Sequence, residues 1–300
     1  MSEVPEGFKA GFVALVGRPN VGKSTLLNAL LEQKVSIVTR KPQTTRHRIQ
    51  GIHQREDAQI IYVDTPGIHD SGKTAMNRYL NDAAGSALAD VDVVVMLVES
   101  GRWGEGEDLV LRRLNAVRSP VILAVNKVDR VRDKNQLLPE IERLSKRYNF
   151  AAIVPISALK ADNLAALEAA ILEQLPESPP LFPQDQITDR SERFMAAELV
   201  REQLTLALGD ELPYASTVEI EAFEQEGQLR RIAAIIWVER RGQRQIMIGE
   251  GGSRAKQIGT DARHEMERVF GGRVYLKLWV KVREGWSDDA RILQSLGYAD

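Results

Sequence analysis

The stretch GRPNVGKST, residues 17–25, decides how the first half of this chain folds. It follows the apolar run FVALVG and precedes the run LLNALL, so it lies where a strand turns into a helix. Two glycines separated by four residues and followed by Lys23 and Ser24 are typical of a loop whose backbone N–H groups surround phosphates. Lys23 would then reach the terminal phosphates of a nucleotide, and Ser24 would bind Mg²⁺. The alternative is an ordinary strand-to-helix turn that contains two glycines.

Apolar strand-like runs and helical stretches alternate from this loop to residue 175. The strand-like runs are almost continuously apolar, as in parallel strands that are covered on both faces. We therefore predict an α/β domain with a mostly parallel sheet over residues 1–175. Residues 49–64 differ, because only the polar REDA separates two strand-like runs there, which predicts one antiparallel hairpin at a sheet edge.

Composition narrows the function classes. The chain has 300 residues, no cysteine and a formal net charge of -2, and its length fits two domains. The lack of cysteine excludes disulfides and thiolate zinc sites, and the near-neutral charge favours no polyanion binding by the whole chain. The N-terminus lacks the pattern of a secretion signal, and the apolar runs are too short to span a bilayer. We expect a cytoplasmic protein, with peripheral membrane contact left open.

The second half begins with a proline-rich segment. Residues 176–190 hold four prolines between positions 176 and 183, which predicts a linker because proline neither continues a helix nor enters a sheet interior. Residues 191–300 then predict a smaller α+β domain of overall order α-β-β-α-α-β. The expected elements are a helix over 191–209, strands over 216–223 and 230–241, a short strand over 244–252, a helix over 253–271 and a strand over 273–282.

Two further motifs follow predicted strands. Asp64 ends the strand AQIIYVD and opens DTPG, so it would hold Mg²⁺ at the C-terminal edge of the sheet, while the N–H of Gly67 would meet a γ-phosphate. The alternative for Asp64 is an aspartate that opens a Pro-Gly turn. In NKVD, Asn126, Lys127 and Asp129 follow the strand ILAV, and the Asp129 carboxylate would accept two N–H bonds from the edge of guanine. A polar helix start is the alternative for NKVD.

A fourth stretch, VPISALK, again follows a predicted strand. Its Ser157, Ala158 and Leu159 would form a loop whose backbone closes over the base, although Ser-Ala is a common pair and a weak signal by itself. The candidate nucleotide-binding residues are Gly17, Arg18, Pro19, Asn20, Val21, Gly22, Lys23, Ser24, Thr25, Asp64, Thr65, Pro66, Gly67, Asn126, Lys127, Asp129, Ser157, Ala158 and Leu159.

Together these motifs resemble translation-factor-type P-loop GTPases over residues 10–175. The resemblance implies a threonine that binds Mg²⁺ when GTP is present, and in QTTRHR this is Thr45 rather than Thr44, with a solvated loop as the alternative. It also implies two switch segments, residues 35–48 and 64–74, which the γ-phosphate orders. The implied catalytic residues are Lys23, Thr45, Asp64 and Gly67, and the implied metal ligands are Ser24, Thr45 and Asp64.

One position departs from this family. Ile68 stands where many of these GTPases carry a glutamine that orients the attacking water. Isoleucine cannot do this, so our hypothesis is that backbone groups, metal ions or a partner position the water. The next residue, His69, is a weak substitute, because a single loop histidine is usually solvated. Asn20 resembles the P-loop asparagine that some such GTPases use with K⁺, and its alternative role is to stabilise the turn.

The C-terminal region has a different charge from the whole chain. Residues 228–283 hold 13 Lys and Arg against 5 Asp and Glu, a formal charge of about +8, which indicates a polyanionic partner. GEGG at 249–252 has the GxxG spacing of a KH-domain loop, which lets single-stranded RNA run close to the main chain. Glu250 departs from the basic residues often found there and would repel phosphate. The candidate RNA-binding residues are Ile248, Gly249, Glu250, Gly251, Gly252, Arg254, Lys256 and Arg263.

Several of these residues have ordinary structural alternatives. Ile235, Ile246, Ile248 and Ile258 are candidates for an apolar base-binding groove, and each is equally a candidate for the core. The cations after the GxxG loop are either phosphate contacts or solvated helix positions. Trp279 alternates with charges in YLKLWVKV, so it lies either in the core or on an exposed stacking face.

A P-loop GTPase joined to a type II KH domain resembles a family of bacterial ribosome-assembly GTPases over almost the whole chain, through QTTRHR, TDRSERFMA, ELPY and the tail GWSDDARILQSLGY. The resemblance implies a GTP-hydrolysing switch that binds the 3′ end of small-subunit ribosomal RNA and assists 30S assembly, with peripheral association at the inner membrane. We expect a monomer. Two alternatives remain: a small-molecule P-loop kinase, which NKVD disfavours, and a membrane-associated signalling GTPase whose C-terminal domain binds protein or lipid.

Overall fold

Six strands form the sheet of the first half of the computed structural model, which describes residues 5–67, 75–86, 88, 90–209, 212–296 and 298. Their order in the sheet is β2-β3-β1-β4-β5-β6, and all neighbours are parallel except β2 and β3. The strands are β1 (Lys9–Gly17), β2 (Ile49–Gln54), β3 (Ala58–Asp64), β4 (Val93–Glu99), β5 (Val121–Asn126) and β6 (Ala152–Pro155). The predicted mostly parallel sheet and its antiparallel edge hairpin are confirmed.

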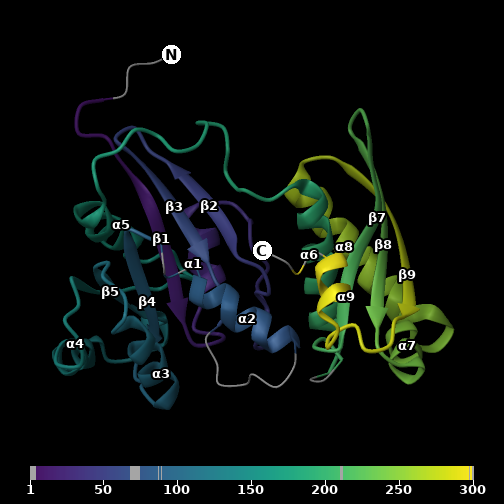
Figure 1. The fold of residues 1–300 in the computed structure, drawn as a ribbon, viewed down its shortest axis with the longest axis horizontal. Helices are drawn as coiled ribbons and strands as arrows, with labels where there is room; N and C mark the ends of the chain where they lie inside the picture. Colours follow the sequence, from purple (N-terminus) through teal and green to yellow (C-terminus); the bar gives the residue numbers. More distant parts are fainter. Residues whose placement is uncertain are drawn as a thin grey trace. The chain divides into compact units, whose positions relative to one another are not determined.

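A helix follows each of these strands in the chain except β2, as expected for parallel strands covered on both faces. They are α1 (Lys23–Leu30), α2 (Ala75–Ser86), α3 (Glu105–Leu114), α4 (Leu137–Ser145) and α5 (Leu164–Gln174). The central strands are buried along nearly their whole length, and β1, β4 and β5 supply much of one hydrophobic cluster with α3. Figure 1 shows β1, β3 and β4 running side by side, so that their C-terminal ends meet at one edge.

The described chain forms two compact units. Unit 1 takes the described residues of Met1–Ser36, Thr45–Ser71 and Leu80–Asp189, and unit 2 takes those of Ile37–Thr44, Gly72–Tyr79 and Arg190–Asp300. The centre of the predicted first switch segment, Ile37–Thr44, is thus grouped with the second half of the chain. No local sequence pattern indicates this grouping.

The proline-rich segment 176–190 is attached to unit 1 by hydrogen bonds. The buried side chain of Gln59 on β3 accepts bonds from the N–H groups of Leu181 and Phe182 at 2.7 and 2.9 Å and donates to the Phe182 carbonyl at 2.8 Å. The N–H of Ile52 on β2 donates to the Ile187 carbonyl at 2.7 Å. The segment contains no helix or strand, as its prolines predict, but it is held along β2 and β3.

Unit 2 contains a three-stranded sheet in the order β7-β8-β9, with β8 antiparallel to β7 and parallel to β9. Its elements are α6 (Glu192–Ala207), β7 (Ser216–Glu226), β8 (Leu229–Val238), α7 (Arg241–Ile248), α8 (Ser253–Phe270), β9 (Arg273–Val282) and α9 (Ala290–Ser295). Up to β9 this is the predicted overall α-β-β-α-α-β order, but the helix α7 lies where the sequence predicts a short strand. No helix of the described residues is long and apolar enough to cross a membrane.

The short strand predicted over 244–252 is wrong, because residues 241–248 form the helix α7. The side-chain oxygen of Gln243 accepts hydrogen bonds from the N–H groups of Glu239 and Arg240, both at 2.9 Å, which caps the start of this helix. Of the apolar run that suggested a strand, Met247 is fully buried while Ile246 is half exposed. In the helix only Met247 of these two side chains enters the core, so the apolar run did not indicate a buried strand.

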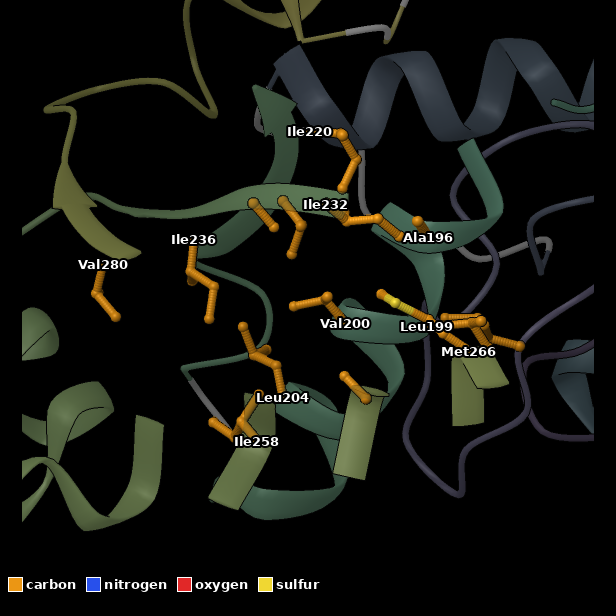
Figure 2. Close-up of a cluster of buried hydrophobic side chains, with 14 of the residues drawn as sticks. Ala196, Leu199, Val200, Leu204, Ile220, Ile232, Ile236, Ile258, Met266 and Val280 are labelled. Carbon is orange, nitrogen blue, oxygen red and sulfur yellow. The ribbon is translucent and has the colours of Figure 1, made fainter. Parts of the chain in front are cut away.

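The core of unit 2 lies between one face of the sheet and the helices α6 and α8. Figure 2 shows Leu199 and Leu204 of α6, Ile236 of β8 and Ile258 and Met266 of α8 turned toward a common interior. All five are fully buried. Only alternate residues of each strand enter this core, so the other face of the sheet is not covered by these helices.

Candidate functional site

The loop between β1 and α1 has the geometry that its sequence predicts. Gly17 and Gly22 have φ values of 152° and 112°, which favour glycine. A Cβ atom at Gly17 would lie 2.6 Å from the carbonyl oxygen of Leu97, and one at Gly22 would lie 2.4 Å from Asn126 Nδ2. Helix α1 begins directly afterwards at Lys23, so its first N–H groups face the loop. The loop can therefore cradle an anion with backbone N–H groups at a helix N-terminus.

Lys23 lies buried inside this loop. Its Nζ donates hydrogen bonds to the carbonyl oxygens of Gly17 and Arg18 at 3.2 and 3.1 Å. Burial lowers the pKa of Lys23 to about 8, and the negative charge of Asp64 opposes this shift. The lysine is held where an anionic ligand of the loop would stabilise its charged form.

Ser24, Thr45 and Asp64 meet at the end of β3. Asp64 Oδ2 accepts hydrogen bonds from Ser24 Oγ at 2.6 Å, from Ser36 Oγ at 3.0 Å and from Thr45 Oγ1 at 3.4 Å. The hydroxyls of Ser24 and Thr45 are 2.9 Å apart. The structure thus brings together the three residues that the sequence predicts as metal ligands.

The chemistry of this cluster fits a hard cation. Burial raises the pKa of Asp64, against the charge of Lys23 and the three hydroxyl donors. Asp64 Oδ1 is buried and has no hydrogen-bond partner among the described residues, an arrangement that a cation or its bound water would satisfy. Hydroxyl and carboxylate oxygens of this number suit Mg²⁺, which keeps several waters and phosphate oxygens as its other ligands.

Thr44, the threonine that was not chosen as a metal ligand, has different hydrogen-bond partners. Thr44 Oγ1 is 2.6 Å from Thr39 Oγ1 and donates to the Lys41 carbonyl at 2.7 Å. These bonds close a turn within residues 37–44. The preference for Thr45 as the metal-binding threonine therefore has a geometric basis in the cluster around Asp64.

The residues after Asp64 approach the phosphate loop closely. Thr65 is buried, and its hydroxyl donates to the Leu15 carbonyl on β1 at 3.0 Å. A Cβ atom at Gly67 would lie 2.8 Å from the backbone nitrogen of Pro19, so only glycine fits there. The rest of the predicted second switch, including Ile68 and His69, lies outside the described residues.

The predicted base-binding residues are tied to the phosphate loop through Asn126. Its Nδ2 donates to the Val21 carbonyl at 2.9 Å, and its Oδ1 accepts from the N–H of Ala158 at 3.0 Å. Ser157 Oγ donates to Asp129 Oδ1 at 2.6 Å. The three stretches around residues 17–25, 126–129 and 157–159 therefore converge, although the side chain of Leu159 is 69% exposed.

Two glutamates beside the loop were not predicted from the sequence. Glu99, the last residue of β4, pairs with Lys127 Nζ at 2.8 Å, and the same Nζ donates to the Asn20 carbonyl at 3.0 Å. Burial acts to raise the pKa of Glu99, but the hydrogen bond and charge of Lys127 hold it below its usual value. Glu107 of α3 pairs with Arg18 at 3.2 Å. These carboxylates brace the lysine of NKVD and the arginine of the phosphate loop.

A cavity of about 260 Å³ lies at this bracing network. Its lining residues are Arg18, Pro19, Asn20, Val21, Glu99, Arg102, Glu107, Lys127 and Arg130. Six of these nine residues carry charge, and Asn20 of the phosphate loop forms part of the wall. No sequence spacing could indicate this cavity, because the lining comes from the loop, β4, α3 and NKVD.

The GxxG stretch forms a glycine turn between α7 and α8. Gly249, Gly251 and Gly252 all have positive φ, at 73°, 55° and 79°. A Cβ atom at Gly249 would meet Arg254 Cβ at 2.9 Å, whereas atoms added at Gly251 and Gly252 would meet nothing within 4 Å. The main chain at Gly251 and Gly252 is therefore open to another backbone, as KH-type binding of RNA requires.

The cations near this turn differ in their surroundings. Lys256 is exposed, and Arg254 is exposed while its guanidinium donates to the Ile246 carbonyl. Arg263, two turns further along α8, forms an ion pair with Glu267 at 2.9 Å. Among the apolar candidates, Ile258 belongs to the core cluster and Ile248 packs against it, while Ile235 is buried on the other face of the sheet, opposite Trp279. Ile246 is 50% exposed and is the candidate that remains free to contact a base.

Comparison with known proteins extends over the whole chain. Residues 12–127 match the family of 50S ribosome-binding GTPases, and residues 211–287 match the KH domain family. The chain is 56% identical over 298 residues to GTPase Era of Marinobacter nauticus and 55% identical to GTPase Era of Pseudomonas aeruginosa. These matches cover 99% of this chain and 97% and 98% of the two relatives.

Solved structures of Era match equally completely. Era in complex with MgGDPNP and nucleotides 1506-1542 of 16S ribosomal RNA has a TM-score of 0.93 and 39% identity, covering 98% of this chain and 100% of that one. A variant of Aquifex aeolicus Era bound to GDP and AlF4⁻ has a TM-score of 0.94 at the same identity and coverage. From its motifs, its two units and these full-length matches, this chain belongs to the GTPase Era family.

Proposed function

We propose that this GTPase is a switch that grips the 3′ end of small-subunit ribosomal RNA in its GTP state, releases it after hydrolysis and so assists assembly of the 30S subunit. The observation that carries the proposal is the full-length similarity to an Era structure that holds MgGDPNP and 16S ribosomal RNA together. The nucleotide of that complex suits the loop around Lys23, and its RNA suits the open glycine turn at Gly251.

In the proposed reaction, water attacks the γ-phosphate of GTP and gives GDP and phosphate. Ser24, Thr45 and Asp64 would hold Mg²⁺, which when bound neutralises charge on the β- and γ-phosphates. Lys23, buried between carbonyl oxygens, would place its ammonium against the terminal phosphates. Gly67 would donate its N–H to the γ-phosphate, since its backbone already lies close to Pro19.

Base selection would come from Asp129. Its carboxylate, positioned by the Ser157 hydroxyl at 2.6 Å, would accept two N–H bonds from guanine, whereas adenine offers no matching donors. Asn126 holds the loop of Ala158 next to it, so the same geometry supports closing of that loop over the base. This selectivity disfavours the alternative of a small-molecule kinase.

K⁺ beside Asn20 is a further part of the proposal. Asn20 has a positive φ of 62° in the phosphate loop, and its carbonyl is held by Lys127. With no glutamine at position 68, a second cation would supply charge stabilisation that the chain itself lacks. Faster GTP turnover in KCl than in NaCl is expected, and equal rates would remove K⁺ from the mechanism.

The proposed location is the cytoplasm, where ribosomes assemble. The chain has no cysteine, so it forms no disulfide that would require an oxidising compartment. Peripheral contact with the inner membrane rests on the family resemblance alone, as does the monomeric state. The competing function is a signalling GTPase whose basic C-terminal unit binds anionic lipid or protein.

Fluorescence anisotropy tests the proposal. The labelled probes are an RNA of nucleotides 1506-1542 and a scrambled RNA of the same composition, added to protein loaded with GDP or with a non-hydrolysable GTP analogue. We expect selective binding of the first RNA only with the analogue. Equal binding of both RNAs in both nucleotide states would overturn the switch. Binding to anionic vesicles that RNA does not displace would favour the signalling GTPase.

A further inference from the structure

The uncovered face of the unit 2 sheet carries a row of aromatic and basic side chains on its edge strand β9. Arg273, Tyr275, Lys277, Trp279 and Lys281 alternate with residues that face the helices, and all five are exposed. Tyr275 is 47% exposed and Trp279 is 41% exposed, which is unusual for such large rings. We call these five residues the β9 row.

Neighbouring side chains extend this row onto β8. Arg231 stands opposite Tyr275 in the sheet, with its guanidinium 5.8 Å from the centre of that ring. Lys277 Nζ is also 5.8 Å from the Tyr275 ring. Arg231 and Lys277 therefore flank the Tyr275 ring, as cation–π pairs at a surface do, and the rings of Tyr275 and Trp279 both remain partly exposed.

The far side of the same face has the opposite charge. Exposed glutamates lie on β7, among them Glu221, Glu224 and Glu226. Glu226 pairs with Arg231 at 3.0 Å, and Glu221 lies 3.9 Å from Lys281. Within the described residues no ion pair is recorded for Lys277 or Arg273. Because Arg231 of β8 is paired with Glu226, the positive charge that these glutamates do not pair lies along β9.

The glycine turn uses a different part of the unit. It joins α7 to α8, and α8 packs its buried residues into the core on the opposite face of the sheet from the β9 row. A GxxG loop clamps about four nucleotides of RNA backbone. The RNA in the related Era structure spans nucleotides 1506-1542, so most of that RNA must lie beyond such a clamp.

We propose that the β9 row is a second RNA-binding surface, on which bases of single-stranded RNA stack on Tyr275 and Trp279 while Lys277 and Lys281 meet the phosphates. This inference rests on the proposed function, because it assumes that RNA is the ligand of unit 2. Side chains four residues apart on a strand are about 13 Å apart, with Lys277 midway between the rings. Stacking on aromatic rings beside cations is how proteins hold single-stranded RNA without reading every base.

The arrangement suits a linear polyanion better than a membrane surface. A strand of RNA can follow β9 alone, whereas a flat anionic bilayer would also cover the glutamates of β7. Among the described residues, the strands of this sheet also expose no large aliphatic side chain, and Ile235, which lies opposite Trp279, is only 3% exposed. A face that binds a membrane needs exposed apolar side chains that enter the bilayer.

Paired RNA lengths test the proposal on the full-length protein loaded with a non-hydrolysable GTP analogue. The long probe is RNA of nucleotides 1506-1542. The short probe is about ten nucleotides from its 3′ end, which is enough for the glycine turn. The double variant Tyr275→Ala/Trp279→Ala should weaken binding of the long RNA about tenfold or more and leave the short RNA unchanged. Tyr275→Phe/Trp279→Phe keeps two rings and should restore tight binding.

Charge variants provide the matched comparison. Lys277→Ala should lower the salt dependence of long-RNA binding by about one ion. Lys146→Ala removes an exposed lysine directly after α4 in unit 1 and should leave that slope unchanged. Unfolding temperatures of all variants should match the parent protein, because every substituted side chain is exposed.

The outcomes separate the two proposals. Unchanged long-RNA affinity in the double alanine variant would overturn the second surface, and so would an equal loss for both RNAs. Loss of binding to vesicles of anionic phospholipid with RNA binding intact would assign the row to membranes instead. If the parent protein binds neither RNA, the proposed function itself fails.

Discussion

At the scale of single residues, the site depends on a few buried polar groups whose charge states are set by their surroundings. Lys23 is buried with a pKa lowered to about 8, while burial raises the pKa of the neighbouring Asp64. The motifs identified both residues. Ser36 and Glu99 were missed, because their partners Asp64 and Lys127 lie 28 residues away in the chain in each case.

The lowered pKa of Lys23 predicts that binding of GTP takes up a proton. The pKa is about 8 in the free protein, and terminal phosphates would raise it toward or above the ordinary 10.5. The bound state then holds more protons than the free state above about pH 8, so affinity should fall as pH rises from there to about 10.5.

Calorimetry in two buffers of different ionisation enthalpy measures this uptake. At pH 9, GTP should take up a fraction of a proton, whereas GMP, which lacks the terminal phosphates, should take up less. Equal proton uptake for the two nucleotides would show that Lys23 does not meet the terminal phosphates.

Replacing Asp129 tests the assignment of the base. In Asp129→Asn the amide replaces one acceptor by a donor, so GTP should bind at least about tenfold more weakly and XTP should become the preferred ligand. Competition between labelled GTP and unlabelled XTP measures the change. Asp133→Asn, at an exposed position four residues further on, should behave like the parent protein. Normal preference for GTP in Asp129→Asn would mean that another loop selects the base.

At the scale of elements, the glycine turn and the helices on either side of it form the site that is proposed to bind RNA. Sequence patterns predicted α8 and the turn correctly, because an amphipathic helix after GxxG has a strong local signal. They failed for α7, whose three consecutive apolar residues resemble a strand. A short apolar run has no period, so only its packing through Met247 decides between helix and strand.

Gly251→Asp tests the turn. Its Cβ would meet nothing within 4 Å, and its φ of 55° lies in a region that aspartate tolerates better than most residues, so the fold should persist. The added carboxylate would face the RNA backbone, and binding of the short RNA should weaken about tenfold or more while GTP affinity stays the same.

The matched control is Gly7→Asp, because Gly7 also has a positive φ, 76°, and open space around it. This substitution places the same charge and backbone cost in unit 1, far along the chain from the turn. Anisotropy with the short RNA compares the two variants. Equal RNA affinity of Gly251→Asp and Gly7→Asp would contradict the KH-type role of the turn.

At the scale of the whole molecule, the chain forms two units, and each unit combines segments that are far apart in the sequence. Residues 37–44, which lie between two nucleotide-binding motifs, are grouped with unit 2. Within that unit, the N–H of Val38 donates to Glu202 of α6 at 2.9 Å, and Ile37 belongs to the core cluster. The proline-rich segment does the opposite. It leads toward unit 2 in the chain, but it remains hydrogen-bonded to the strands β2 and β3 of unit 1.

The sequence by itself determined the α/β class, the phosphate loop, the base-binding motif and the glycine turn. Each of these depends on residues that are close together in the chain, so spacing and periodicity are sufficient to specify them. Only the tertiary structure decided that Ser36 joins Asp64, that Glu99 braces Lys127 and that Tyr275 and Trp279 stand exposed on one face. These features arise when distant segments pack together, and no local pattern records which side chains will then meet or stay exposed.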